Sequence, residues 1–125
     1  MATWREIATE SFGSAGLLLQ DQRWRSTVSR AYYAVYGRVA EALTDCGMTM
    51  PKGREGPSHG GLPEMIVDHL KDLKDGRWRL SSLVGTLYRL RLNADYYPSL
   101  LVDDSQARSA VRIMREVFRI MKGGI

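Results

Sequence analysis

Helical periodicity runs through almost the whole sequence, and it constrains the fold more than any other feature. Apolar residues recur at intervals of three and four positions, as on the buried face of an α-helix. No stretch alternates apolar and polar residues for long enough to predict a β-strand, and β-branched residues are scattered. A chain of 125 residues suits one domain with one core. We therefore expect a single all-α domain over residues 1–125.

Capping and helix-breaking residues predict four long helices and one short one. Thr3 and Glu6 form a capping box before the first helix, and Gly47 suits the position just after the second. A segment rich in glycine and proline follows, which no helix can continue through. Long helices with mostly short connections predict an antiparallel up-and-down four-helix bundle with an extra short helix. The expected helices span about 4–20, 23–46, 63–73 and 80–95, and the last starts at Asp103 or Asp104 and ends at Gly123.

The second expected helix can pack on two sides. Its main apolar stripe consists of Val28, Ala31, Tyr32, Val35, Val39, Ala42 and Leu43. The opposite side carries an aromatic and small residues in place of the usual charges, namely Tyr33, Ala34, Gly37 and Ala40. Small side chains let another helix approach closely, and that helix belongs either to the same chain or to a second subunit.

Composition and charge limit the class of protein. The net charge of +4 permits an anionic partner such as RNA or a nucleotide, but does not require one. The single cysteine, Cys46, excludes an internal disulfide framework and suits a reducing compartment. No apolar run approaches the length of a membrane span, and the N-terminus lacks an apolar signal core. We expect a cytoplasmic protein that does not contact membranes.

Arg91 stands inside the apolar stripe of the fourth expected helix, where a charge is costly unless it is paired or used. Asp95 lies one helical turn further along the same side, whereas Arg89 points to solvent. Two interpretations follow. Either Arg91 and Asp95 form a structural pair that fixes the end of the helix, or the guanidinium lines an interhelical cleft and donates to a phosphate.

No metal or cofactor site is expected. One cysteine and two distant histidines do not make a zinc site. The stretch "GREGPSHGG" lacks the Gly-Lys-Ser/Thr ending of a phosphate-binding loop. A Ser-His-Asp triad cannot be argued from spacing.

Three stretches together resemble the HEPN domain (higher eukaryotes and prokaryotes nucleotide-binding). They are "RSTVSRAYYAVYGRVAEAL" at 25–43, "HGGL" at 59–62 and "LYRLRLNADYYP" at 87–98. The pattern is most similar to small stand-alone bacterial and archaeal members that carry "SRAYYA" and "R-x-x-A-D-Y". The resemblance covers nearly the whole chain. It implies an up-and-down helical bundle, usually a homodimer, with a cleft where functional arginines of both subunits face each other.

The resemblance leaves catalysis open. Many HEPN proteins are metal-independent ribonucleases whose motif is Arg, four to six intervening residues, then His. Arg91 matches the motif arginine, but Tyr96 stands five positions on, and no histidine occurs after His69. Tyrosine is a poor general base at neutral pH. The candidate catalytic residues are therefore Arg91, Tyr96 and His59.

The ligand-binding residues that the resemblance implies surround the same arginine. Arg30 matches the family pattern, and we expect it near the Arg91 cleft, paired with Asp95 or with an acid of a neighbouring subunit. His59 lies in a glycine-rich loop, where it either contacts an anion near a helix N-terminus or is an ordinary exposed or capping residue. The expected ligand-binding set is Arg30, Tyr33, Arg91, Asp95 and Tyr97.

A row of arginines marks the last expected helix. These residues recur at intervals of four, three and four, Lys122 extends the row, and Glu116 is the one acid among them. Such a row is either a solvated face or a stripe that follows an RNA backbone. The RNA-backbone candidates are Arg108, Arg112, Arg115 and Arg119.

The expected function is binding of a nucleotide or RNA phosphate within a toxin–antitoxin or defence pair. Small HEPN proteins are often encoded beside a minimal nucleotidyltransferase, which implies that enzyme as a partner. The alternatives are a divergent metal-independent ribonuclease toxin and a non-catalytic helical adaptor. A homodimer is expected because the second helix has two packable sides and Ile113 and Ile120 widen the apolar face of the last helix.

Overall fold

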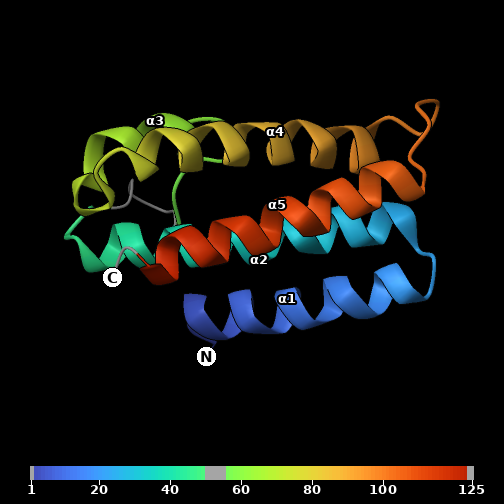
Figure 1. Cartoon of the computed structure of the whole chain (residues 1–125), viewed down its shortest axis with the longest axis horizontal. Coiled ribbons are helices and arrows are strands. Elements are labelled where there is room, and N and C mark those ends of the chain that lie inside the picture. Colours follow the sequence, from blue (N-terminus) through green and yellow to red (C-terminus); the bar gives the residue numbers. More distant parts are fainter. Residues whose placement is uncertain (1, 50–55, 124–125) are drawn as a thin grey trace.

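The computed structural model describes residues 2–49 and 56–123, and within these ranges every regular element is a helix. The all-α class and the up-and-down bundle with an extra short helix are confirmed (Figure 1). Part of the expected glycine- and proline-rich connection, residues 50–55, lies outside the described residues. In chain order the elements are α1 (Trp4–Gln20), α2 (Trp24–Asp45), α3 (Leu62–His69), the 3₁₀ helix η1 (Lys71–Leu73), α4 (Gly76–Tyr96) and α5 (Asp104–Gly123).

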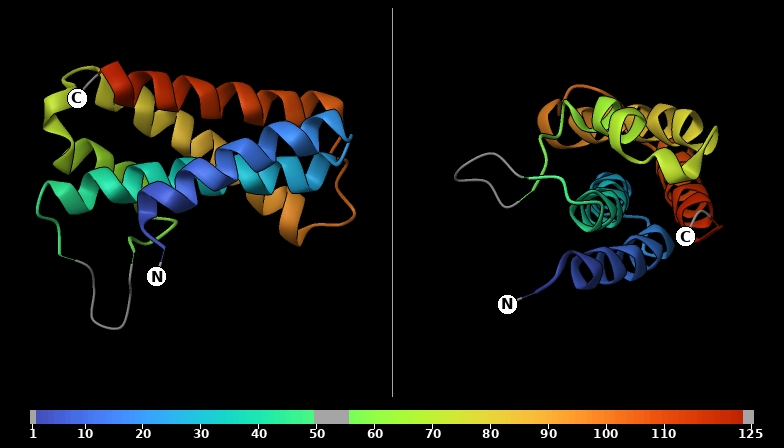
Figure 2. Two further views of the ribbon diagram at one scale, coloured as in Figure 1. Left: turned by 90° about the horizontal axis from the view of Figure 1, so that it is seen from below. Right: turned by 90° about the vertical axis from the view of Figure 1, so that its left-hand side faces the viewer.

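The α2 helix occupies the centre of the bundle. It packs against α1, α4 and α5, while α3 lies along α4. Viewed along the helices, α2 and α5 lie between α1 and the α3–α4 pair (Figure 2). Tyr32 of α2 is the largest side chain that is fully buried. This central position lets α2 contribute side chains both to the α4 side and to the α1–α5 side of the molecule.

Local signals at the helix ends act as the sequence predicted. The Thr3 hydroxyl accepts a hydrogen bond from the backbone N–H of Glu6 at 3.1 Å, and the Glu6 carboxylate accepts one from the N–H of Thr3 at 3.3 Å. Before α5, the Asp103 carboxylate accepts from the backbone N–H of Ser105 at 3.0 Å. Gly47 follows α2 with a φ of 91°, a left-handed conformation that glycine adopts without strain.

Two helices in the middle of the chain differ from their expected boundaries. Helix α4 begins at Gly76 rather than near residue 80, because Lys74, with a φ of 54°, turns the chain just before it. The segment expected as one helix over 63–73 is divided. Helix α3 ends at His69, and the buried Leu70 leaves the helical conformation before η1 begins.

The second packable side of α2 is covered by α1. A Cβ added to Gly37 would lie 3.1 Å from the backbone oxygen of Trp4 and 3.2 Å from the Cβ of Ala8. Ala34 and Ala40 on the same side are fully buried. The helix that these small residues admit is therefore internal, and the interpretation of this side as a subunit contact is wrong.

The extra apolar residues of α5 are also used inside the bundle. Ile113 is half-buried and packs against the core. Ile120 is half-buried, and its Cγ2 would be 3.7 Å from a Cβ added to Gly76 at the start of α4. These residues therefore do not support the expected homodimer, and a contact between subunits would have to involve another part of the surface.

Candidate functional site

Arg91 of α4 is buried, with 8 % of its surface exposed, and it lies at the centre of a polar and aromatic cluster. Its Nε donates to a carboxylate oxygen of Asp95 at 2.9 Å, one turn along the same helix. Its Nη2 donates to the hydroxyl of Tyr33 at 2.8 Å and to that of Tyr96 at 3.3 Å. The structural pair between Arg91 and Asp95 that the sequence allowed is thus formed.

Three tyrosine rings surround the guanidinium of Arg91. Its Cζ lies 5.0 Å from the ring centroid of Tyr96, 5.4 Å from that of Tyr33 and 5.6 Å from that of Tyr32. These are cation–π distances, and such contacts strengthen where water is excluded. Burial opposes the charge of Arg91, but Tyr33, Tyr96 and Asp95 outweigh burial and raise its pKa. Arg91 therefore stays positively charged.

Tyr32 connects this arginine to His59. The Tyr32 ring lies under the guanidinium, while its hydroxyl is 2.7 Å from Nδ1 of His59. The His59 ring also stacks on Tyr36 with 4.4 Å between centroids and meets Tyr33 edge-on at 6.2 Å. Burial, followed by the nearby Tyr36, raises the pKa of Tyr32, so its hydroxyl keeps its proton at neutral pH. Here His59 is an integral part of the cluster, held through its ring.

The segment before α3 is fixed onto α2 by Tyr36. The Tyr36 hydroxyl donates to the backbone oxygen of Pro57 at 2.5 Å. A Cβ added to Gly56 would lie 2.5 Å from that hydroxyl and 2.8 Å from the ring of Trp4, so this close approach requires glycine. The contacts at positions 56, 57 and 59 therefore set where the histidine lies.

Arg25 secures the end of α4, and the sequence analysis missed this residue. Its Nη1 donates to the backbone oxygens of Ala94 at 3.0 Å and of Asn93 and Tyr97 at 3.3 Å. Its Nη2 donates to the backbone oxygens of Pro98, at 3.3 Å, and Leu100. These carbonyls belong to a helix end and the turn after it, where intrahelical partners are missing. One guanidinium of α2 therefore holds the turn that follows the site.

Some of the site residues that the sequence predicted contact one another in the structure, and others do not. Arg91, Asp95, Tyr33, Tyr96 and His59 come together. The exposed Arg30 forms no ion pair within the described residues, and Asp95 accepts instead from Arg91 and from the Ser29 hydroxyl at 3.2 Å. The Tyr96 hydroxyl lies 3.3 Å from the arginine, whereas the Tyr97 side chain makes no hydrogen bond or ring contact with it within the described residues.

The surface next to the cluster is apolar. Tyr96 and Tyr97 are 60 % and 54 % exposed, and Leu100 and Leu101 are 45 % and 75 % exposed. They follow one another around the turn that Arg25 holds. Exposed apolar groups that adjoin in this way are typical of surfaces that contact a partner.

The arginine row of α5 lies on the exposed face, as expected, but part of its charge is matched. Arg108 pairs with Asp104 at 2.6 Å, and Arg119 pairs with Glu116 at 2.5 Å. Arg112 donates to the hydroxyl of Ser109 at 3.2 Å. The row therefore has fewer unmatched charges than its spacing alone indicated.

The described part of the chain offers neither a metal-binding cluster nor a membrane-spanning helix. No group of three or more His, Cys, Asp and Glu side chains there could hold a metal ion. Likewise, among the helices in those ranges none combines the length and the apolar character that crossing a membrane demands.

The existing hydrogen bonds of Arg91 limit how the cluster could bind an anion. The Nε and Nη2 atoms of Arg91 already have protein partners, and the exposed Tyr96 at the end of α4 covers one side of the guanidinium. A phosphate that displaced the Tyr96 hydroxyl would gain a charge-assisted hydrogen bond from a group that is already desolvated. The same region offers aromatic faces and one imidazole.

Comparison with known proteins agrees with this architecture. A family model described as HEPN domain matches residues 1–124. The chain is also similar to a UPF0332 protein of Thermotoga maritima, with 25 % identity over 111 residues that cover 87 % of this chain and 78 % of that protein. No solved structure matches the chain.

Proposed function

This chain belongs to the HEPN domain family, and from that premise we propose that it binds the phosphate of a nucleotide or of RNA at Arg91. The observation that carries the proposal is the cluster itself, in which a buried, charged arginine is surrounded by tyrosines and joined to His59. Aromatic rings beside a guanidinium suit a ligand that carries both a base and a phosphate. In this proposal Tyr33 and Asp95 orient the arginine, and the phosphate displaces the Tyr96 hydroxyl as its hydrogen-bond partner.

An arginine substitution with a matched control tests the site. Arg91→Gln should remove the binding of ATP, whereas Arg89→Gln makes the same charge change at an exposed position of α4 and should leave ATP binding intact. Circular dichroism establishes that both variants remain helical. If a folded Arg91→Gln protein bound ATP as tightly as the unchanged chain, Arg91 would be a structural residue of a helical adaptor.

We further propose that the protein acts as a homodimer. The support is the exposed apolar surface formed by Tyr96, Tyr97, Leu100 and Leu101 beside the Arg91 cluster. Pairing two copies across this surface would bring two arginines to one cleft and double the positive potential there. Light scattering at micromolar concentration should report twice the chain mass of 14.1 kDa, and a monomer would contradict the shared cleft.

The cellular role that we propose is one half of a toxin–antitoxin or defence pair in the cytoplasm. The single cysteine fits a reducing compartment, and family membership favours a minimal nucleotidyltransferase as the other half. Co-expression with the product of an adjacent nucleotidyltransferase reading frame, followed by co-purification, tests the pairing. If the adjacent reading frame encoded an unrelated protein, the proposed nucleotidyltransferase partner would lose its support.

A ribonuclease is the second candidate, because Tyr32 joins Arg91 to the one imidazole in the cluster. In this role Arg91 would stabilise charge on the phosphate, and His59 would carry the proton that Tyr96 cannot. The expected signature is cleavage of RNA in EDTA that leaves 2′,3′-cyclic phosphate ends and is lost in His59→Gln. Assorted RNAs that stay intact in EDTA, with and without the partner, would exclude it.

A further inference from the structure

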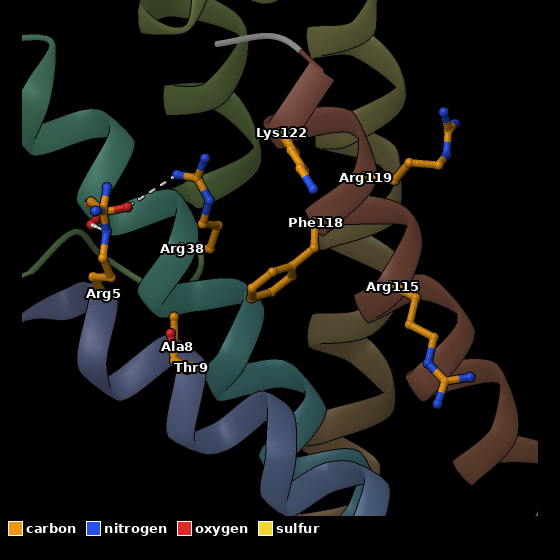
Figure 3. Close-up of a pocket in the computed structure, with 9 residues that line it drawn as sticks. Arg5, Ala8, Thr9, Arg38, Arg115, Phe118, Arg119 and Lys122 are labelled. Carbon is orange, nitrogen blue, oxygen red and sulfur yellow. Dashed lines mark hydrogen bonds and ion pairs between the residues drawn. The ribbon is translucent and has the colours of Figure 1, made fainter.

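A groove lies where α1, α2 and α5 meet, away from the Arg91 cluster. It has a volume of about 670 Å³ and is lined by Arg5, Ala8, Thr9, Arg38, Glu41, Arg115, Phe118, Arg119 and Lys122 (Figure 3). Five of these nine residues are basic and one is acidic. The groove shares no residue with the Arg91 cluster, so a ligand here would not depend on the function proposed above.

The acid in the groove cannot neutralise its neighbours. The Glu41 carboxylate accepts from Arg5 at 2.8 Å and from Arg38 at 3.3 Å, so two guanidiniums share one negative charge. The Arg38 and Glu41 side chains are only 15 % and 14 % exposed, whereas that of Arg5 is 76 % exposed. Glu41 therefore fixes Arg38 in position and leaves one positive charge unmatched at the wall of the groove.

The α5 side of the groove adds a cation and an aromatic ring. The Phe118 ring extends from α5 toward α2, and Lys122 lies on the same helix near it (Figure 3). The half-buried Phe118 ring is supported from behind by Phe12, with 4.7 Å between ring centroids. A supported aromatic ring with cations beside it is the arrangement on which an unpaired base stacks while its phosphates meet basic side chains.

The basic surface continues beyond the groove along α5. Arg115 and Arg119 extend from the outer side of the helix rather than toward Arg38 (Figure 3). Arg119 is held by Glu116, and Glu116 also accepts from Arg79 at 3.2 Å, so three charged groups form a network with one excess positive charge. A chain that leaves the groove past Lys122 would meet further basic side chains at helical spacing.

We propose that the groove between α1, α2 and α5 binds single-stranded RNA, with its backbone on Arg5, Arg38 and Lys122 and one base on Phe118. A segment of acidic peptide would satisfy the charges but would have no use for the aromatic ring. The open shape and the row of basic residues along α5 suit a strand longer than one nucleotide. This surface would bind RNA independently of its sequence.

Fluorescence anisotropy with a labelled single-stranded RNA of mixed sequence tests the proposal. The unchanged protein is compared with Arg38→Gln/Lys122→Gln and with a matched double variant, Arg23→Gln/Arg89→Gln, which loses the same charge at exposed positions outside the groove. We expect the groove variant to bind RNA at least tenfold more weakly than the matched control. Its slope of log affinity against log salt should be shallower by about 1.4, or about 0.7 for each lost phosphate contact.

Two further variants keep the test decisive. Phe118→Leu retains an apolar side chain in place of the ring and should weaken RNA binding about fivefold or more. ATP binding should be equal in the groove variant and in the matched control, which separates the groove from the Arg91 site. Equal affinity in the groove variant and the matched control would overturn the proposal. So would polyglutamate binding that matches RNA binding and falls in the same variants, because the surface would then accept any polyanion.

Discussion

The hydroxyl of Tyr32 lies 2.7 Å from Nδ1 of His59, so a fully buried residue of α2 holds the segment that precedes α3. The two residues are 27 positions apart in the chain. Because the same tyrosine ring lies under the guanidinium of Arg91, any change at this position acts on both sides of the cluster.

Tyr32→Phe should lower the free energy of unfolding by about 1 kcal/mol, because it deletes a buried hydrogen bond but keeps the ring. Denaturant unfolding measures the change. Tyr97→Phe removes the same atom from an exposed side chain and should have no effect on stability. Equal stabilities for the two variants would mean that the contact between Tyr32 and His59 contributes nothing to the fold.

Alanine at two glycines should change stability in opposite directions. Gly37→Ala would bring a Cβ to 3.1 Å from the Trp4 backbone oxygen, and this crowding should outweigh the gain in helix propensity and destabilise the protein by about 1–3 kcal/mol. Gly13→Ala, with open space around the added Cβ in α1, should stabilise it by up to about 1 kcal/mol. Thermal unfolding of the two variants measures both changes in stability. A stabilised Gly37→Ala protein would show that α1 does not press on α2.

Arg25→Gln should destabilise the protein by about 1.5–3 kcal/mol, since the charged donors to the backbone oxygens of Asn93, Ala94 and the turn after them are lost. Arg25→Lys should recover little of this, because an ammonium cannot reach several carbonyls with the fork of a guanidinium. Hydrogen exchange should report faster opening of residues 93–100 in both variants. The exposed Arg23→Gln serves as the control, with exchange in that segment expected to match the unchanged protein.

Glu116 should give α5 a stability that depends on pH. Its hydrogen bond from Arg119, helped by Arg79, lowers the pKa of the Glu116 carboxyl to about 2 from an ordinary value of 4.5. A lowered pKa means that the charged pair stabilises the fold above pH 4.5 and loses this effect as the pH falls toward 2. The thermal midpoint should therefore fall more steeply over this range than that of Glu116→Gln. Added salt should shrink the difference, because both arginines are exposed to solvent. Parallel curves for the two proteins would rule out the network.

Local signals predicted most of the fold. The capping box at Thr3, the left-handed Gly47 and the acidic residue before α5 each act within a few positions, so the sequence alone shows them. The start of α4 could not be predicted from the sequence. It depends on a positive φ at Lys74, a conformation that a lysine residue does not indicate. The internal partner of Gly37 depended on how α1 crosses α2, which periodicity does not specify.

The candidate site could be predicted only in part. Arg91 and Asp95 are one helical turn apart, so their pairing follows from spacing. Arg25 reaches carbonyls 68 to 75 positions away, and nothing near it in the sequence indicates that it caps another helix. Arg30 was expected in the cleft from its place in a motif, yet it is Tyr33, about one turn on, that faces Arg91.

The residues of the Arg91 cluster are far apart in the sequence, and this separation affects the order in which the protein folds. Tyr33 and Arg91 are 58 positions apart, and Ser29 and Asp95 are 66 apart, whereas α1 and α2 are joined by a short turn. Contacts between distant positions form late, because a long loop must close first. A nascent chain can therefore pair its first two helices well before the arginine cluster exists. The Arg91 cluster is complete only once α4 has packed against α2.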